Sequence, residues 1–315
     1  MTMVVGVSPD RRGRSALHLA GLLARSAEDD LVLCTVIPAP WPPSPAKVDA
    51  EYRTELERVA AEALAQARAE IPADISAATL VRPARSVPAG LLEAAEEHDA
   101  RLLVVGPSPA GALGRVALGS VSGRLLHSSP ILVALPPRGY RCAPDARVTR
   151  VTAAYGGSPG SDDLVVAAAD VTARVGASLR LASFAVRPRP PYTSGVGTVA
   201  EHAMVEQWVE EIESAGRAVL DRVRELAAVP RGLETVVGYG ETWEEALEDV
   251  EWQDGDVLVV GSSAVGPIAR VFLGSRASKI VRSSPVPVIA VPRGTAEERA
   301  GRAARADQAA GTGRS

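Results

Sequence analysis

The stretch that decides the fold is residues 101–139, RLLVVGPSPAGALGRVALGSVSGRLLHSSPILVALPPRG, because a close copy follows at residues 256–294. The second copy reads DVLVVGSSAVGPIARVFLGSRASKIVRSSPVPVIAVPRG, and nearly half of the aligned positions are identical without a gap. Copies this far apart indicate a duplicated domain rather than a short solenoid repeat. Each copy places an apolar strand, a glycine-bearing loop and a Gly-Ser helix start in series.

Strand and helix patterns alternate through both halves of the chain. Short β-branched apolar runs are typical of parallel strands buried on both faces, and amphipathic stretches separate them. This alternation predicts an α/β fold with two tandem open parallel five-stranded sheets flanked by helices, in a Rossmann-like arrangement. The expected strands are 3–7, 31–37, 75–81, 101–106, 131–135, 148–155, 178–186, 233–238, 256–261 and 286–291, and the expected helices are 13–27, 48–70, 85–98, 119–128, 161–175, 199–228, 241–252 and 275–283.

Composition divides the chain into four segments. Residues 1–137 and 148–293 form the two expected domains, and the Pro-, Gly- and Arg-rich residues 138–147 form a linker. Residues 294–315 contain almost no large apolar side chain, which is typical of a disordered tail.

Charge and cysteine content exclude several protein classes. The formal net charge of −4 and the pI near 5.7 give no basic surface for nucleic acid or an anionic membrane. No run reaches the roughly 18 apolar residues of a membrane span, and the start of the chain reads as a strand rather than a secretory signal. Cys34 is expected to be a small buried hydrophobe, and Cys142 an unreactive linker thiol. We expect a cytoplasmic protein that neither inserts into a membrane nor binds nucleic acid.

The loop after the fourth strand of each half is the candidate binding site. Ligands of open α/β sheets bind beyond the carboxyl ends of the strands, where the strand order reverses. Glycine lets the backbone approach a phosphate, and a helix N-terminus supplies free amides and a positive dipole end. The same residues also fit ordinary turn and cap chemistry, so both interpretations stay open. The candidate nucleotide-binding residues are Gly106, Gly111, Arg115, Gly119 and Ser120 in the first copy and Gly261, Gly266, Arg270, Gly274 and Ser275 in the second.

The order of these motifs resembles the universal stress protein (UspA) family. The register G-x2-G-x9-G-[ST] after an apolar strand, then a helix and an SSP-containing strand, is similar to that family's domain over residues 3–136 and 148–293. The opening segments 4–24 and 151–173 also look like the family's start. The resemblance implies a tandem two-domain member with an adenine nucleotide alpha hydrolase-like fold. It further implies an intramolecular pseudo-dimer in which strands 131–135 and 286–291 pair, and it leaves homodimer formation open.

The resemblance implies ATP, with Mg²⁺ as its companion, for some members and no nucleotide for others. Family members that bind ATP carry a middle glycine in the loop and an Asp after the first strand. Pro109 and Ala264 replace that glycine here, and Ser8 and Gly156 stand where the Asp is expected. Proline is excluded from a position that needs a positive φ, although Gly111 and Gly266 offer a shifted turn two residues later. The second copy is therefore the better candidate for a nucleotide site.

Three functions follow as hypotheses. The first is a non-enzymatic stress-response module that acts through an adenine nucleotide or an unknown protein partner. The second is a degenerate scaffold that binds no nucleotide and regulates a partner through its surface. The third is an ATP-using enzyme, because YGGSPGSDD at 155–163 superficially resembles an ATP pyrophosphatase loop, although Tyr155 stands where that loop has Ser.

Other polar residues give no sign of a catalytic centre. The four histidines are scattered without the spacing of metal ligands, and no residue stands out as a general base, so slow ATP hydrolysis is the most activity that we expect. The acidic run Glu244, Glu245, Glu248 and Asp249 is expected to be a solvated helix face. Proline-rich loops at 38–46 and 187–197 are expected to overhang the carboxyl edge of each sheet.

Overall fold

The computed structural model describes residues 2–9, 13–39, 46–187, 198–262 and 274–292. Gly266, Arg270, Ala264, the expected tail and most of the two proline-rich loops lie outside these ranges.

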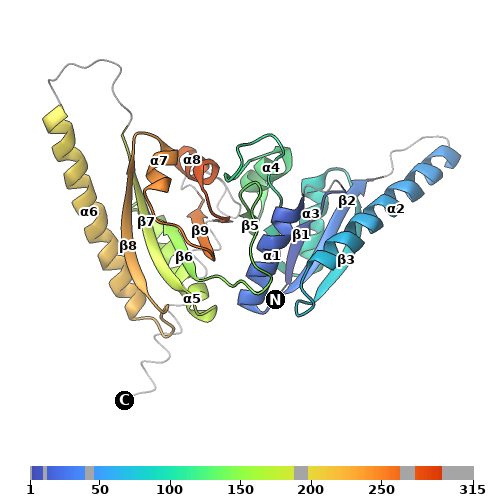
Figure 1. The fold of residues 1–315 in the computed structure, drawn as a ribbon, viewed down its shortest axis with the longest axis horizontal. Coiled ribbons are helices and arrows are strands. Elements are labelled where there is room, and N and C mark those ends of the chain that lie inside the picture. The colour runs from blue at the N-terminus through green and yellow to red at the C-terminus, as the bar shows by residue number, and fades with distance from the viewer. Residues whose placement is uncertain (1, 10–12, 40–45, 188–197, 263–273, 293–315) are drawn as a thin grey trace.

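The described elements form two lobes of five strands and four helices each (Figure 1). Lobe one contains β1 (Thr2–Gly6), α1 (Arg14–Ala27), β2 (Asp30–Pro38), α2 (Ala46–Glu70), β3 (Ala77–Ala84), α3 (Val87–Glu97), β4 (Ala100–Val104), α4 (Ser120–Ser128) and β5 (Leu132–Leu135); lobe two contains β6 (Arg150–Ala154), α5 (Pro159–Arg174), β7 (Ser178–Val186), α6 (Thr198–Arg224), β8 (Leu233–Gly240), α7 (Trp243–Glu248), β9 (Asp256–Gly261), α8 (Ser275–Ser283) and β10 (Val288–Val291).

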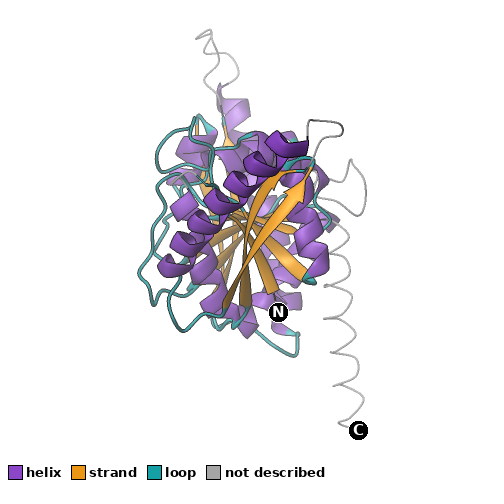
Figure 2. Ribbon diagram, turned by 90° about the vertical axis from the view of Figure 1, so that its right-hand side faces the viewer, coloured by secondary structure: helices purple, strands orange, loops and turns teal. Residues whose placement is uncertain are grey.

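The strands of both lobes join into one ten-stranded sheet with the order β3-β2-β1-β4-β5-β10-β9-β6-β7-β8. Pairing is parallel within each lobe and antiparallel at the junction, where Val288 lies opposite Leu135 and Ala290 opposite Val133. The expected pairing of the two last strands is thus confirmed, and it makes the two predicted sheets continuous. Figure 2 shows the strands fanning across one another with helices around them, as the natural twist of a wide sheet requires.

Two hydrophobic cores, one on each face of the sheet, hold the lobes together. One core contains Leu19 of lobe one and Leu179 of lobe two, and the other contains Leu103 and Leu258. Burying each such leucine stabilises the fold by roughly 1.5–3 kcal/mol. Because both cores run through the junction, the lobes are expected to unfold as one unit.

The linker between the lobes has no helix or strand but is fixed to α1. The Val148 amide donates to Ser26 Oγ over 2.7 Å, and Arg147 donates to the carbonyl oxygen of Arg25 over 2.6 Å. Tyr140 packs against the core that contains α1. The linker therefore adds to the contact between the lobes.

Strand order reverses once in each lobe, between β1 and β4 and between β6 and β9. The carboxyl ends of these strand pairs are the switch points where open α/β sheets place ligands. The two candidate loops follow β4 and β9, so each begins at a switch point.

Candidate functional site

The lobe-one loop, residues 107–119, is folded onto itself. The Ser108 amide donates to the Ala117 carbonyl over 2.7 Å, and the Gly114 amide donates to the Arg138 carbonyl over 2.9 Å. Gly111 lies so close to Ala117 that an added Cβ would stand 2.3 Å from the Ala117 Cβ. Gly111 therefore serves the packing of the loop. The loop's positive φ of +77° falls at Gly114, which sequence reasoning did not single out.

At the start of α4, a side chain of the helix accepts a hydrogen bond from the amide of the N-cap residue. The Gly119 amide donates to Ser122 Oγ over 2.8 Å. A Cβ added to Gly119 would lie 3.2 Å from that of Ser108, so the two ends of the loop meet here. Ser120 is exposed in the first turn, whereas Gly106, at the other end of the loop, makes only an ordinary contact with Ala16 of α1.

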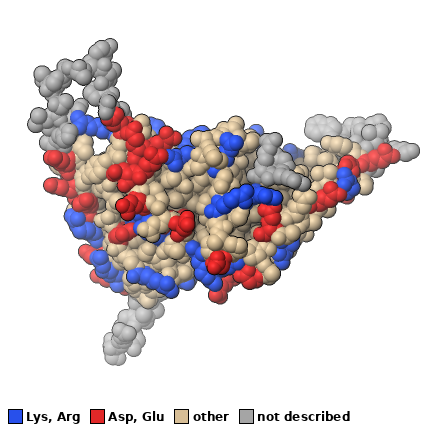
Figure 3. Space-filling model, viewed as in Figure 1, with Lys and Arg blue, Asp and Glu red and all other residues tan. Residues whose placement is uncertain are grey.

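Arg115 is turned toward lobe two. Its guanidinium forms an ion pair with Glu248 and lies 4.0 Å from a carboxylate oxygen of Glu244. Two members of the acidic run on α7 thus hold an arginine of the other lobe, so the expectation of a merely solvated face was incomplete. Figure 3 shows acidic side chains gathered near α7 on this face of the molecule. Any anion that recruits Arg115 has to compete with these carboxylates.

The start of α8 in lobe two differs from that of α4. Gly274 precedes the helix with φ −65°, and no side chain within the described ranges caps it. Ala277 occupies the position of Ser122, so the hydroxyl that accepts from the Gly119 amide in lobe one has no counterpart here. Arg276 lies exposed in the first turn and forms no ion pair with any described residue. The contrast between Ser122 and Ala277 is visible in the aligned copies, and so is Arg276, but their significance depends on the cap geometry.

The residues that follow β1 and β6 make equivalent contacts at the two switch points. The Tyr155 amide donates to the Ala182 carbonyl and the Val7 amide to the Cys34 carbonyl, both over 2.8 Å. Ser8 and Gly156 follow these residues and are exposed, and neither offers a carboxylate. Gly261, which ends β9 at the same switch point as Gly156, packs against Leu164 of α5.

Residues 155–163, which superficially resemble an ATP pyrophosphatase loop, make contacts that hold helices to the sheet. The buried phenol of Tyr155 donates to Asp162 Oδ1 over 3.0 Å, and burial raises the pKa of Tyr155 to about 12. Asp162 also lies 3.5 Å from the guanidinium of Arg222. This carboxylate therefore holds α5 and α6 to the sheet, and its contacts favour a structural role over a catalytic one.

A buried ionic cluster at the starts of β6 and β9 escaped the sequence analysis. Arg150 donates two hydrogen bonds to Asp256, at 3.0 and 2.6 Å, and Asp256 is only 2% exposed. Arg180 stacks on Trp252 with its guanidinium 4.8 Å from the ring centroid and donates to the Glu251 carbonyl. The pKa of Arg180 is lowered by burial and by the neighbouring Arg150 charge. The cluster lies at the ends of these strands opposite to the switch point.

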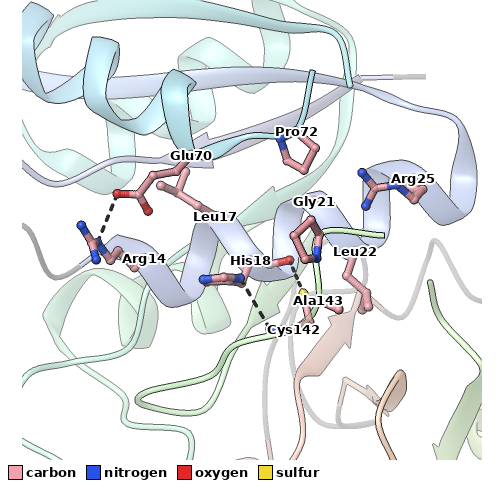
Figure 4. Close-up of a pocket in the computed structure, with 11 residues that line it drawn as sticks. Arg14, Leu17, His18, Gly21, Leu22, Arg25, Glu70, Pro72, Cys142 and Ala143 are labelled. Carbon is pink, nitrogen blue, oxygen red and sulfur yellow. Dashed lines mark hydrogen bonds and ion pairs between the residues drawn. The ribbon is translucent and has the colours of Figure 1, made fainter. Parts of the chain in front are cut away.

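A hollow of about 280 Å³ lies where the linker meets α1 (Figure 4). The Cys142 thiol donates to the His18 carbonyl over 3.3 Å, and the Cys142 amide donates to the His18 ring over 3.5 Å. Burial raises the pKa of Cys142 and lowers that of His18. A thiol with a raised pKa is a poor nucleophile. The linker thus packs against α1 here, and Cys142 is half-buried.

Two further features are absent from the part of the chain that the structure describes. No group of three or more His, Cys, Asp or Glu side chains could hold a metal ion there. No helix there is long and apolar enough to cross a bilayer.

Comparison with known proteins identifies the family. The model of the Universal stress protein family matches residues 1–135 and again residues 147–292. The chain belongs to the universal stress protein family. A universal stress protein of Mycobacterium bovis is 41% identical over 296 residues, which cover 93% of this chain and 100% of that relative. One from Mycolicibacterium smegmatis is 27% identical over 322 residues, which cover 92% and 96%.

Solved universal stress proteins share the fold across both lobes. A crystal structure from Archaeoglobus fulgidus is 20% identical, covers 93% of this chain and 98% of its own, and has a TM-score of 0.61. A putative universal stress protein from Pseudomonas aeruginosa is 14% identical with a TM-score of 0.55, and it covers 96% and 97%. The chain is thus a tandem two-domain universal stress protein with an open, mostly parallel α/β sheet in each half.

Proposed function

We propose that this protein is a non-enzymatic stress-response regulator that binds one adenine nucleotide in lobe two, with the phosphates at the start of α8. The observation that carries this proposal is the difference between the two helix starts. Neither N-cap glycine supplies a side-chain cap, but at α4 the Gly119 amide is bonded to Ser122, whereas at α8 Ala277 offers no such bond and Arg276 stands in the first turn.

Helix electrostatics explain why this difference favours lobe two. The first amides of a helix lack partners within the helix, and the dipole adds a partial positive charge there. At α8, the guanidinium of Arg276 and the hydroxyl of Ser275 add donors to the same turn. Arginine binds phosphate through two parallel hydrogen bonds. At α4, Val121 stands in place of Arg276, and the Gly119 amide is already used.

The nucleotide acts as a signal in this proposal, and ATP with Mg²⁺ is the form that we expect. The phosphates would bind main-chain amides and Arg276, and any Mg²⁺ would come with the nucleotide. Nucleotide binding then alters the surface to which a protein partner binds. Family membership and the position of α8 at the β6/β9 switch point support this assignment.

Calorimetry of the full chain with Mg-ATP tests the proposal. Gly274→Val should abolish binding, because a side chain blocks close approach of a phosphate while φ −65° stays accessible to any residue. Arg276→Gln should weaken binding about tenfold, as expected for one lost charge-assisted hydrogen bond. The matched lobe-one variant, Val121→Ala, should leave affinity unchanged. Unchanged affinity of Gly274→Val would remove α8 from the site.

A scaffold that binds no nucleotide is the second candidate. The closed lobe-one loop favours it, because Arg115 pairs with Glu248 and the Gly119 amide with Ser122. Under this alternative, millimolar Mg-ATP would produce neither heat nor a thermal shift. A measured binding heat that Gly274→Val removes would exclude it.

A further inference from the structure

One face of the sheet is hollowed between α1 of lobe one and α5 of lobe two. This interlobe cavity has a volume of about 590 Å³, and its floor is formed by Leu102 and Leu132 of lobe one with Val257 and Ile289 of lobe two. These residues belong to or pack against the core that contains α1 and α5. Helix α8 contributes to the other core, so the cavity and the proposed nucleotide site lie on opposite faces of the sheet.

The interior of the interlobe cavity is apolar. Leu23 and Ala168 form walls above the floor. The two hydroxyls that reach the lining are already used by the protein, since Ser26 Oγ accepts from Val148 and Thr172 Oγ1 donates to the Ala168 carbonyl. Ligand pockets commonly have volumes of roughly 300–1,000 Å³, lie between domains and are mostly apolar. Water would find few partners here, so the interior suits a hydrocarbon.

Arg101 stands at the mouth of the cavity because the sheet is irregular there. Thr2 of β1 pairs with Ala100 and Met3 with Leu102, so Arg101 is an extra residue in β4. The equivalent ladder in lobe two pairs Arg150 with Asp256 and Val151 with Val257 without an extra residue. A bulge re-aims the side chain that it carries. The bulge is thus a feature of lobe one that places a cation beside an apolar cavity.

The two arginines at the mouth differ in whether a described residue pairs with them. Arg174 is paired with Asp170 at 3.5 Å, and Asp29 has a partner of its own. Arg101 is exposed and forms no hydrogen bond or ion pair with any described residue. Glu28 also lines the mouth as an exposed carboxylate.

We propose that the interlobe cavity binds a molecule with an extended hydrocarbon chain and a carboxylate head, of the fatty-acid class. The chain lies over the central strands between α1 and α5, and the head accepts hydrogen bonds from Arg101. The planar guanidinium suits a carboxylate because it can donate two parallel hydrogen bonds. This site is independent of the nucleotide and joins residues of both lobes.

Binding of hexadecanoate to the delipidated full chain, measured by displacement of a fluorescent fatty acid, tests the proposal. We expect one hexadecanoate per chain. Arg101→Gln should weaken binding about tenfold, as expected for a lost hydrogen bond to a charged group. Arg124→Gln is the matched control, because Arg124 is exposed on α4 away from the cavity. Hexadecylamine should bind at least tenfold more weakly than hexadecanoate.

Two further variants separate loss of the cavity from loss of the fold. Ala168→Leu fills the interior, and Ala27→Trp covers the mouth from an exposed position at the end of α1. Both should abolish hexadecanoate binding, and Ala27→Trp should keep the parent melting temperature. No binding by the parent chain, or binding that survives both variants, would overturn the site. Equal binding of hexadecylamine, or an unchanged affinity in Arg101→Gln, would overturn the assigned head group.

Discussion

Truncating Leu135 at the junction of the lobes should destabilise both lobes equally. Leu135 is fully buried, pairs with Val288 across the antiparallel junction and lies in a core that both lobes share. Leu135→Ala should lower the free energy of unfolding by about 3 kcal/mol, through lost apolar contact and the cavity left behind. For a slope near 3 kcal/mol per M, the urea midpoint should fall by about 1 M.

Two probes follow the lobes separately in this experiment. In a Trp41→Phe background, tryptophan fluorescence reports lobe two, because Trp208, Trp243 and Trp252 all belong to it. In a Cys142→Ser background, alkylation of Cys34 reports lobe one, because this thiol is 1% exposed on β2. Both midpoints should shift together. A shift of the Cys34 transition alone would refute the shared cores, and the control Leu113→Ala, at a 76% exposed position, should shift neither.

Three further predictions concern titration, buried charge and thiol reactivity. Burial lowers the folded-state pKa of His18 below its ordinary value near 6.5, so the unfolded chain binds more protons and stability should fall as pH drops below that value. Melting temperatures between pH 7.5 and 5.5 should therefore fall less in His18→Gln than in the parent, and parallel curves would contradict this. Asp256→Asn should cost about 3–5 kcal/mol of unfolding free energy, because it leaves the buried Arg150 and Arg180 charges without their carboxylate. Asp221→Asn, on an ion pair with Arg224 in which both side chains are exposed, should leave the urea midpoint nearly unchanged, and equal effects of the two variants would refute the role of burial. Burial raises the pKa of Cys34 to about 11 and also raises that of Cys142, so iodoacetamide at pH 7.5 should label both far more slowly than a free thiol until urea unfolds the chain. Rapid labelling of the folded chain would contradict the burial of these two thiols.

The α/β architecture could be predicted from the sequence, because parallel strands that are buried on both faces consist of apolar runs. The junction also followed from the family resemblance, since β5 and β10 close the two copies. Element ends depended on local chemistry. Strand β10 starts at Val288 rather than at 286, because Pro287 has no amide to donate. Helix α7 covers only Trp243–Glu248, with Thr242 capping its start.

The candidate site was less predictable because it depends on contacts between distant residues. Arg115 looked like a phosphate ligand in the loop, yet its ion pair with Glu248 spans the two lobes. Gly111 looked like a shifted turn, whereas it packs on Ala117. The exchange of Ser122 for Ala277 is plain in the aligned copies. Its meaning appears only once Ser122 is seen to hold the Gly119 amide.

Native mass spectrometry of the full chain with Mg-ATP tests the central claim most directly. The protein should carry one adenine nucleotide per chain, and Gly274→Val should lose it while Val121→Ala retains it. Two bound nucleotides, none, or one that survives Gly274→Val would contradict a single site at α8.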